Sequence, residues 1–190
     1  MQVDALAQHV LGSPAGLNGS RLVCIDGRAG AGKTSLAAEL EAALRTARSV
    51  TTVHMDDLYA GWSGLPTVAE QVVAQLVQPW AAGRPGMLAA WDWHRSTRLD
   101  PVPVPLTPVV LLEGVGSWSR RLDGAVSTLV WLECDEQTRR TRACARDGEV
   151  FEVRWDSWAA DEDVVHAREL TRLHADVVID TGAQRAVPAP

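Results

Sequence analysis

The octapeptide GRAGAGKT at residues 27–34 constrains this chain more than any other feature. It fits the pattern G-x-x-x-x-G-K-[ST], whose glycines let backbone N–H groups wrap an anion where a Cβ would obstruct the approach. In this pattern the lysine, Lys33, reaches the β- and γ-phosphates of a nucleoside triphosphate, and the Thr34 hydroxyl can ligate Mg²⁺. The octapeptide therefore predicts a loop that binds the phosphates of ATP.

The residues on either side of the loop favour the same interpretation over a simple Gly/Ala-rich turn. An apolar run at residues 21–25 precedes the loop and ends at Asp26, and residues 34–45 have helical periodicity. The order strand, loop, helix points a helix N-terminus at the anion. One face of that helix is apolar and comprises Leu36, Leu40, Ala43 and Leu44. The expected ATP-binding residues of the loop are Gly27, Arg28, Ala29, Gly30, Ala31, Gly32, Lys33, Thr34 and Ser35.

Composition limits the classes of protein to consider. A chain of 190 residues suits one domain, here residues 1–190, with a sizeable core. The net charge of −6 and the lack of a Lys/Arg-rich block argue against nucleic acid as a partner. We also expect no membrane association, because no apolar run approaches the length of a span and no signal peptide is recognisable. The oligomeric state is left open.

The three cysteines cannot all pair, and none has metal-ligand spacing. Cys24 and Cys134 lie in or beside apolar runs, which favours core thiols in a reducing compartment. We therefore expect a cytoplasmic protein.

Alternating apolar runs and helical segments predict the fold. Further strands are expected at residues 49–54, 109–112, 127–132 and 175–179, and helices at residues 1–11, 66–80, 136–146 and 161–174. This pattern predicts an α/β doubly wound parallel sheet of about five strands, with helices on both faces and ligands at the carboxyl ends of the strands. The Gly- and Pro-rich residues 82–108 are predicted to form an irregular substrate-side excursion. The tail, residues 181–190, is predicted to be frayed.

Acidic residues come directly after two of the predicted strands. Asp56 and Asp57 come after the second, and Glu113 after the third. Phosphoryl transfer needs a phosphate cradle, a metal ion and a carboxylate beside the acceptor hydroxyl. Asp56 is therefore the candidate general base, and Glu113, Thr34 and Asp56 are candidate Mg²⁺ ligands, because hard cations prefer oxygen. For the two aspartates, a solvated turn or helix cap is the alternative.

Three arginines share one face of the predicted helix at residues 136–146. Arg139, Arg142 and Arg146 have the spacing i, i+3, i+7. We expect Arg139 to bind ATP, and Arg142 and Arg146 to stabilise charge on the transferring group, although such a stripe can also be a solvated face. Residues 147–158 are predicted to form a short, mobile lid.

The chain has eight Trp but only one Tyr and one Phe. Two of them, Trp91 and Trp93, lie in the loop-like segment WDWHRSTR, where stacking would suit a nucleoside; Trp62 is a further candidate, whereas Trp131 lies within a strand and is expected in the core. A core role is the alternative for the others as well. The expected acceptor-binding residues are Asp57, Tyr59, Trp91, Trp93, His94 and Arg98.

Together these motifs resemble the uridine kinase and nicotinamide riboside kinase branch of the P-loop small-molecule kinases. HMDDLY at residues 54–59 is similar to the second-strand motif of that branch, whose first Asp is the catalytic base and corresponds to Asp56. Residues 109–114 resemble its apolar-run-Glu-Gly motif, whose Glu helps to bind Mg²⁺ and corresponds to Glu113. The Arg-rich stretch ending at Asp147 resembles the start of its lid. The resemblance implies a P-loop NTPase fold and the use of ATP and Mg²⁺.

The chain departs from uridine kinases on the acceptor side. Those enzymes carry Tyr-Asp-Phe-x-x-His-x-Arg where this chain has WDWHRSTR, so that Arg98 matches but Ser96 stands at the His position. The substrate-side Asp that they place soon after the second strand has no counterpart. The sequence thus predicts an ATP-dependent phosphotransferase acting on a hydroxyl of a small, nucleoside-like molecule. The alternatives are a nucleoside monophosphate kinase, a regulatory P-loop ATPase, and a catalytically dead binding protein.

Overall fold

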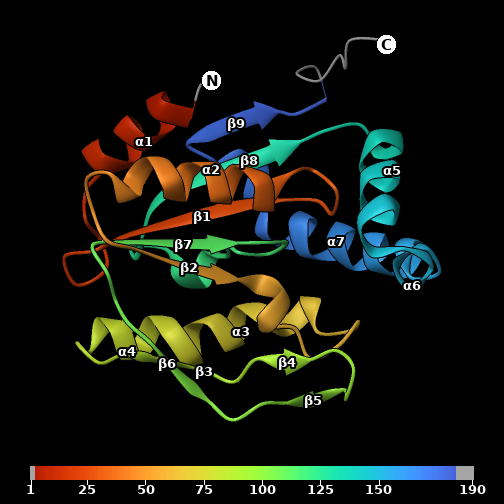
Figure 1. Cartoon of the computed structure of the whole chain (residues 1–190), viewed down its shortest axis with the longest axis horizontal. Helices are drawn as coiled ribbons and strands as arrows, with labels where there is room; N and C mark the ends of the chain where they lie inside the picture. Colours follow the sequence, from red (N-terminus) through yellow and green to blue (C-terminus); the bar gives the residue numbers. More distant parts are fainter. Residues whose placement is uncertain (1–2, 183–190) are drawn as a thin grey trace.

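A five-stranded parallel sheet forms the centre of the computed structural model, which describes residues 3–182 (Figure 1). The strand order is β2-β7-β1-β8-β9. The strands are β1 (Arg21–Gly27), β2 (Val50–His54), β7 (Val109–Glu113), β8 (Val126–Glu133) and β9 (Val177–Asp180). Every pairing in this sheet is parallel, which confirms the predicted doubly wound sheet.

Alternate residues of the strands supply two separate cores. Leu22 and Cys24 of β1 face one core, and Val23 and Ile25 face the other, because successive side chains of a strand point to opposite sides. Helices α1 (Val3–Gly12) and α2 (Lys33–Arg45) cover the second core, and α2 contributes its predicted apolar face. Most of the other helices contribute side chains to the first core, on the opposite face of the sheet (Figure 1).

The helix predicted at residues 66–80 is confirmed, but it is irregular. It consists of η2 (Leu65–Thr67), α3 (Val68–Val72), a π-helical turn η3 (Val73–Val77) and α4 (Gln78–Ala81). The π turn comes just before Pro79, which has no N–H to donate and whose ring crowds the carbonyl four residues back. The wider turn therefore carries the helix past the proline.

The prediction that residues 82–108 are irregular is wrong in part. The segment forms two antiparallel pairs, β3 (Gly86–Leu88) with β6 (Val102–Val104) and β4 (Trp91–Asp92) with β5 (Thr97–Arg98). The Asp92 carboxylate accepts the N–H groups of His94 and Arg95, which closes the turn between β4 and β5. Trp80 anchors the other pair, because its indole N–H donates to the carbonyl of Val104.

The C-terminal helices differ from the sequence prediction in extent. They are α5 (Glu136–Asp147), α6 (Glu149–Glu152), α7 (Trp155–Glu169) and α8 (Thr171–His174), and a short turn, η4 (Arg120–Leu122), precedes β8. The predicted lid is thus mostly helical, and its Phe151, Trp155 and Trp158 are buried in the first core. The helix predicted at residues 161–174 starts at Trp155 and breaks at Leu170, whose φ is +56°.

Three smaller predictions can also be compared with the structure. Cys24 and Trp131 are buried as expected, whereas Cys134 is partly exposed. Thr181 is held in place, because its hydroxyl donates to the carbonyl of Ala31; the rest of the predicted frayed tail, from residue 183, lies outside the described residues. Within residues 3–182, no helix is both long and apolar enough to cross a membrane.

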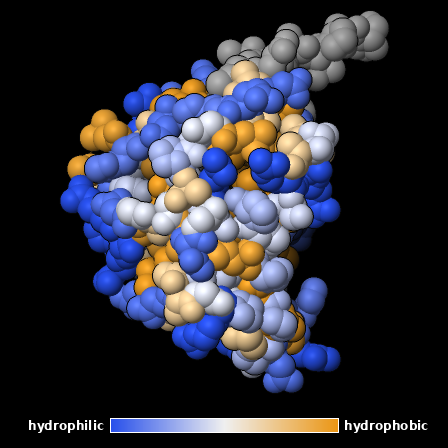
Figure 2. Space-filling view, turned by 90° about the vertical axis from the view of Figure 1, so that its left-hand side faces the viewer, coloured by the Kyte–Doolittle hydropathy of each residue, from blue (hydrophilic) through white to orange (hydrophobic). Residues whose placement is uncertain are grey.

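Polar and apolar side chains are interspersed over the surface at the amino ends of the strands (Figure 2). The polar clusters predicted from the sequence lie instead at the carboxyl ends, where the strands of a parallel sheet place a ligand site.

Candidate active site

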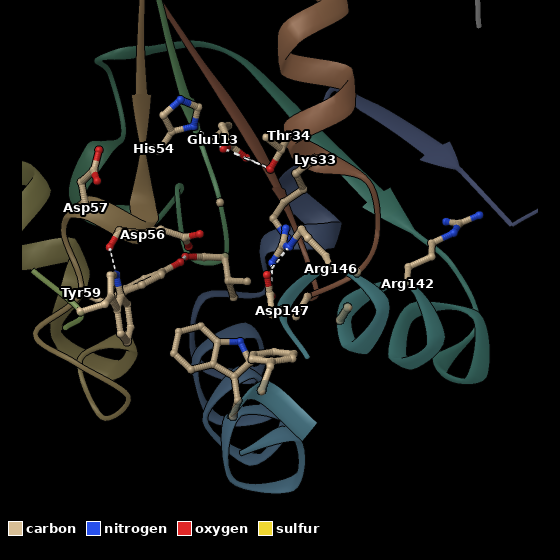
Figure 3. Close-up of a pocket in the computed structure, with 18 of the residues that line it drawn as sticks. Lys33, Thr34, His54, Asp56, Asp57, Tyr59, Glu113, Arg142, Arg146 and Asp147 are labelled. Carbon is tan, nitrogen blue, oxygen red and sulfur yellow. Dashed lines mark hydrogen bonds and ion pairs between the residues drawn. The ribbon is translucent and has the colours of Figure 1, made fainter. Parts of the chain in front are cut away.

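A cavity of about 990 Å³ opens at the carboxyl ends of β1, β2 and β7. Three groups of residues line it: the phosphate loop with the start of α2, the acidic residues after β2 and β7, and a set of aromatic and arginine side chains (Figure 3). The doubly wound sheet thus brings together segments that are far apart in the sequence.

The phosphate loop adopts backbone conformations that require glycine. Gly30 has φ +77°, and a Cβ there would lie 2.1 Å from the carbonyl oxygen of Arg139. Gly27 has φ +144°, and a Cβ there would lie 2.4 Å from the carbonyl oxygen of Leu132. Both glycines therefore permit close approach of the backbone, as the motif predicts.

Lys33 is buried at the start of α2, and its Nζ donates to the carbonyl of Arg28 at 3.0 Å. Burial lowers the pKa of this ammonium, and nearby carboxylates, led by Glu162 and Asp26, oppose the change. Of the predicted ATP-binding residues, those that line the cavity are Ala29, Gly30, Gly32, Lys33, Thr34 and Ser35. Gly27, Ala31 and Arg28 do not line it, and Arg28 turns away to pair with Asp163 at 2.5 Å.

Glu113 and Thr34 lie next to each other, as a shared Mg²⁺ site requires. The Thr34 hydroxyl lies 3.3 and 3.4 Å from the two carboxylate oxygens of Glu113. Both groups offer the oxygen ligands that Mg²⁺ prefers, so the residues present fit this ion. Among residues 3–182, no group of three or more His, Cys, Asp or Glu is arranged to hold a metal alone. An ion here would therefore need oxygens from a bound phosphate as well, which is usual for Mg²⁺.

His54 belongs to the same cluster, although it was not predicted from the sequence to be part of the site. Its Nδ1 lies 2.5 Å from a carboxylate oxygen of Glu113, the residue opposite it on β7. The hydrogen bond to Glu113 raises the pKa of the imidazole. Only the register of β2 against β7 creates this contact, and the register is not readable from either strand alone.

Asp56 and Asp57 form a short turn, η1 (Met55–Asp57), directly after β2, and both line the cavity. The Asp56 carboxylate points toward the centre of the cavity, whereas that of Asp57 points in a different direction (Figure 3). Burial and the charge of Glu113 raise the pKa of Asp56, and Lys33 and Arg146 oppose this. Burial also raises the pKa of Asp57, and His54 opposes it.

Aromatic side chains form the wall beside Asp56. Trp62 lies 5.1 Å from Trp93, 5.7 Å from Phe151 and 6.1 Å from Trp158, measured between ring centroids. We call these four residues, with Tyr59, the aromatic wall; all five line the cavity. Phe151 and Trp158 were not predicted as site residues, because their apolar helical spacing is equally typical of a core.

Two predicted acceptor-binding residues lie elsewhere, while Asp57, Tyr59, Trp93 and His94 line the cavity. Arg98 donates to three backbone carbonyls, those of Asp57, Leu58 and Ala89, at 2.7 to 3.2 Å. Its guanidinium also stacks over the ring of Trp91 at 5.5 Å. This pair therefore braces the turn that carries Asp57.

The predicted stripe of arginines is divided between two environments. Arg142 and Arg146 line the cavity; Arg146 pairs with Asp147, and Arg142 donates to the carbonyl of Thr181. Arg139 is buried outside the cavity, where it donates to the carbonyls of Ala29 and Cys134, both at 3.2 Å. Arg139 therefore supports the phosphate loop from behind.

Asp26, at the end of β1, is a further buried residue to which the sequence pattern gave no role. Its carboxylate accepts the N–H groups of Gly27, Gly116 and Trp118 at 2.7 to 3.1 Å. Burial raises the pKa of this carboxyl to about 6. Asp26 joins the phosphate loop to the segment after β7.

Comparison with known proteins supports the fold. No protein-family model and no curated protein matches the chain. Among solved structures, it is similar to a possible uridine kinase from Bacillus stearothermophilus, with 23% identity, a TM-score of 0.70, and coverage of 94% of this chain and 97% of the other. It is also similar to a provisionally named fructose transport system kinase from Silicibacter sp. TM1040, with 20% identity, a TM-score of 0.66, and coverage of 94% and 99%. The chain therefore has the α/β fold of the P-loop kinases, as predicted.

Proposed function

We propose that the protein is an ATP-dependent kinase that transfers the γ-phosphate to a hydroxyl of a small, nucleoside-like molecule. The observation that carries this proposal is a single cavity that combines a phosphate loop, the carboxylate of Asp56 and an aromatic wall. These are the parts that a phosphoryl transfer between two bound substrates needs.

Lys33 and the backbone N–H groups of the loop hold the triphosphate. Thr34 and Glu113 would hold Mg²⁺, which neutralises charge on the β- and γ-phosphates when bound. Asp56 lines the same cavity, and the charge of Glu113 acts on it, so it could share in that role. Arg146 and Arg142 come from α5 on the other side of the cavity, where guanidinium groups stabilise charge on the transferring phosphoryl group.

Asp56 orients the acceptor hydroxyl and accepts its proton. A raised pKa brings this carboxylate closer to the working pH and makes it a better base. The aromatic wall binds a planar part of the acceptor by stacking and keeps water away from the reacting groups.

The acceptor side disfavours a nucleoside monophosphate kinase. Such an enzyme needs a cation to hold the phosphate of the acceptor. The described residues that line this side include His94 and the acidic Asp57. The guanidinium of the nearby Arg98 is already hydrogen-bonded to three backbone carbonyls, so it is not free to hold a phosphate. A regulatory ATPase, in turn, would have no use for an aromatic wall next to a candidate base.

The test is a screen of ATP consumption over nucleosides, riboside precursors of cofactors, sugars and monophosphates, with the product identified by mass. We expect one class of unphosphorylated acceptor to gain about 80 Da, the mass of a phosphoryl group, and Asp56→Asn to slow that gain by about 10²- to 10⁴-fold. Hydrolysis of ATP without any phosphorylated product would favour the regulatory ATPase instead.

A further inference from the structure

Glu162 on α7 is a buried carboxylate that the proposed phosphoryl transfer does not use. Its side chain is 1% exposed. One oxygen, Oε1, accepts hydrogen bonds from the backbone N–H of Ala29 at 2.7 Å and from the indole N–H of Trp158 at 3.0 Å. The other oxygen lies 3.7 Å from Arg28 and 4.0 Å from Arg139. Each of these polar neighbours of the carboxylate is thus a donor or a cation.

The two donors to Oε1 belong to two different parts of the cavity lining. Ala29 lies in the phosphate loop, directly before Gly30, whose backbone packs against Arg139. Trp158 belongs to the aromatic wall, and its ring lies 5.1 Å from that of Tyr59. A single oxygen atom therefore joins the phosphate side of the cavity to the acceptor side.

Packing alone does not explain a carboxylate at this position. Burying a charged or polar side chain is unfavourable unless its hydrogen bonds are satisfied, and an apolar residue here would leave the N–H groups of Ala29 and Trp158 without this acceptor. Burial raises the pKa of Glu162, whereas the N–H of Ala29 and three nearby cations oppose that change. The carboxylate thus matches donors that the phosphate loop itself presents.

We propose that Glu162 is a positioning residue: it fixes the phosphate loop in the conformation that binds ATP and, through Trp158, makes this conformation depend on the acceptor side. The inference deepens the proposed function, but the loop can be tested without turnover. The binding of ATP itself, with Mg²⁺, is measured by calorimetry.

The decisive variants are Glu162→Ala and Glu162→Gln. We expect Glu162→Ala to weaken ATP binding by about tenfold or more, because a charge-assisted hydrogen bond to the loop is lost. The ATP affinity of Glu162→Gln should lie between those of the unaltered protein and Glu162→Ala. The glutamine keeps a carbonyl oxygen for both N–H donors, but its uncharged amide NH₂ group faces Arg28 and Arg139. The matched control is Asp163→Asn, because Asp163 is 68% exposed and pairs with the same Arg28. ATP should bind to this control within about twofold of the unaltered protein, because exposed ion pairs contribute little.

Trp158→Phe tests the connection to the acceptor side. It keeps an aromatic ring in the wall but replaces the indole by a smaller ring without the N–H that donates to Glu162, so we expect ATP to bind several-fold more weakly although the change lies on the acceptor side. ATP affinity unchanged in Trp158→Phe would overturn this connection.

Thermal unfolding of each variant separates positioning from stability. Intact folding with weakened ATP binding supports the inference, and unchanged ATP affinity in a folded Glu162→Ala overturns it. If Glu162→Ala does not fold, Glu162→Gln decides by the same criterion. If the unaltered protein shows no transfer activity while the variants bind ATP as expected here, the proposed kinase function is refuted and the role of Glu162 is not.

Discussion

Replacing Asp56 by Asn tests the proposed chemistry most directly. Asparagine keeps the shape of the side chain but cannot take the proton of the acceptor hydroxyl. General-base catalysis contributes about 10²- to 10⁴-fold, so kcat should fall within that range, which corresponds to about 3 to 5 kcal/mol of the barrier. The Kd for ATP should change little, because Lys33 and the phosphate loop lie on the other side of the cavity and remain intact.

The pH dependence supplies a second measure of the same residue. Asp56 must be ionised to act as a base, so kcat/KM should decrease as the pH falls through its pKa. Burial and Glu113 raise that pKa, so the decrease should begin at a higher pH than for an exposed aspartate. Asp56→Asn should lack this limb of the profile.

Asp57→Asn is the matched control for both measurements, because Asp57 is adjacent but points in a different direction (Figure 3). Its kcat should fall less than that of Asp56→Asn. The reasoning is refuted if Asp57→Asn is inactive while Asp56→Asn keeps its kcat.

Three further substitutions probe other parts of the cavity. Lys33→Ala should abolish transfer and weaken ATP binding, because the ammonium is the point charge on the phosphates; near-normal turnover would contradict the assignment of the loop. Glu113→Gln should raise the Mg²⁺ concentration needed for half-maximal activity, whereas a loss that added Mg²⁺ cannot rescue, with unchanged metal affinity, would give Glu113 another role. Trp93→Ala should raise the KM of the acceptor by about tenfold or more if the acceptor stacks, and leave the KM of ATP nearly unchanged. The control is Trp91→Ala, which should mainly lower the melting temperature. If Trp93→Ala raises the KM of the acceptor and the KM of ATP equally, Trp93 has a structural role and does not bind the acceptor.

Local patterns predicted the sheet and the backbone conformation of the phosphate loop well. The central strands are unbroken apolar runs, and the loop is a fixed spacing of glycine, lysine and threonine, so each is encoded in neighbouring residues. Asp56 and Glu113 could be placed in one cavity because a parallel sheet gathers the carboxyl ends of its strands, and the residues just beyond them, at one edge. The fold therefore converts a position in the sequence directly into a position in the cavity.

The features that were not predicted depend on contacts between distant segments. His54 meets Glu113 only through the register of two strands, and Arg98 is a brace only because the turn after β2 presents carbonyls to it. The face of α5 that carries the arginines is wide enough for Arg139 to turn to the phosphate loop while Arg146 faces the cavity. Helical spacing alone cannot distinguish these directions.

The central place of β1 affects how the chain acquires its structure during synthesis. Although β1 leaves the ribosome early, its hydrogen-bonding partners on either side, β7 and β8, begin only at Val109 and Val126. At translation rates of about 5–20 residues per second, the apolar β1 waits several seconds or more for these partners. Distant pairing of this kind slows folding and leaves strand edges open to other chains. We therefore expect the nascent protein, more than the finished one, to need protection from aggregation.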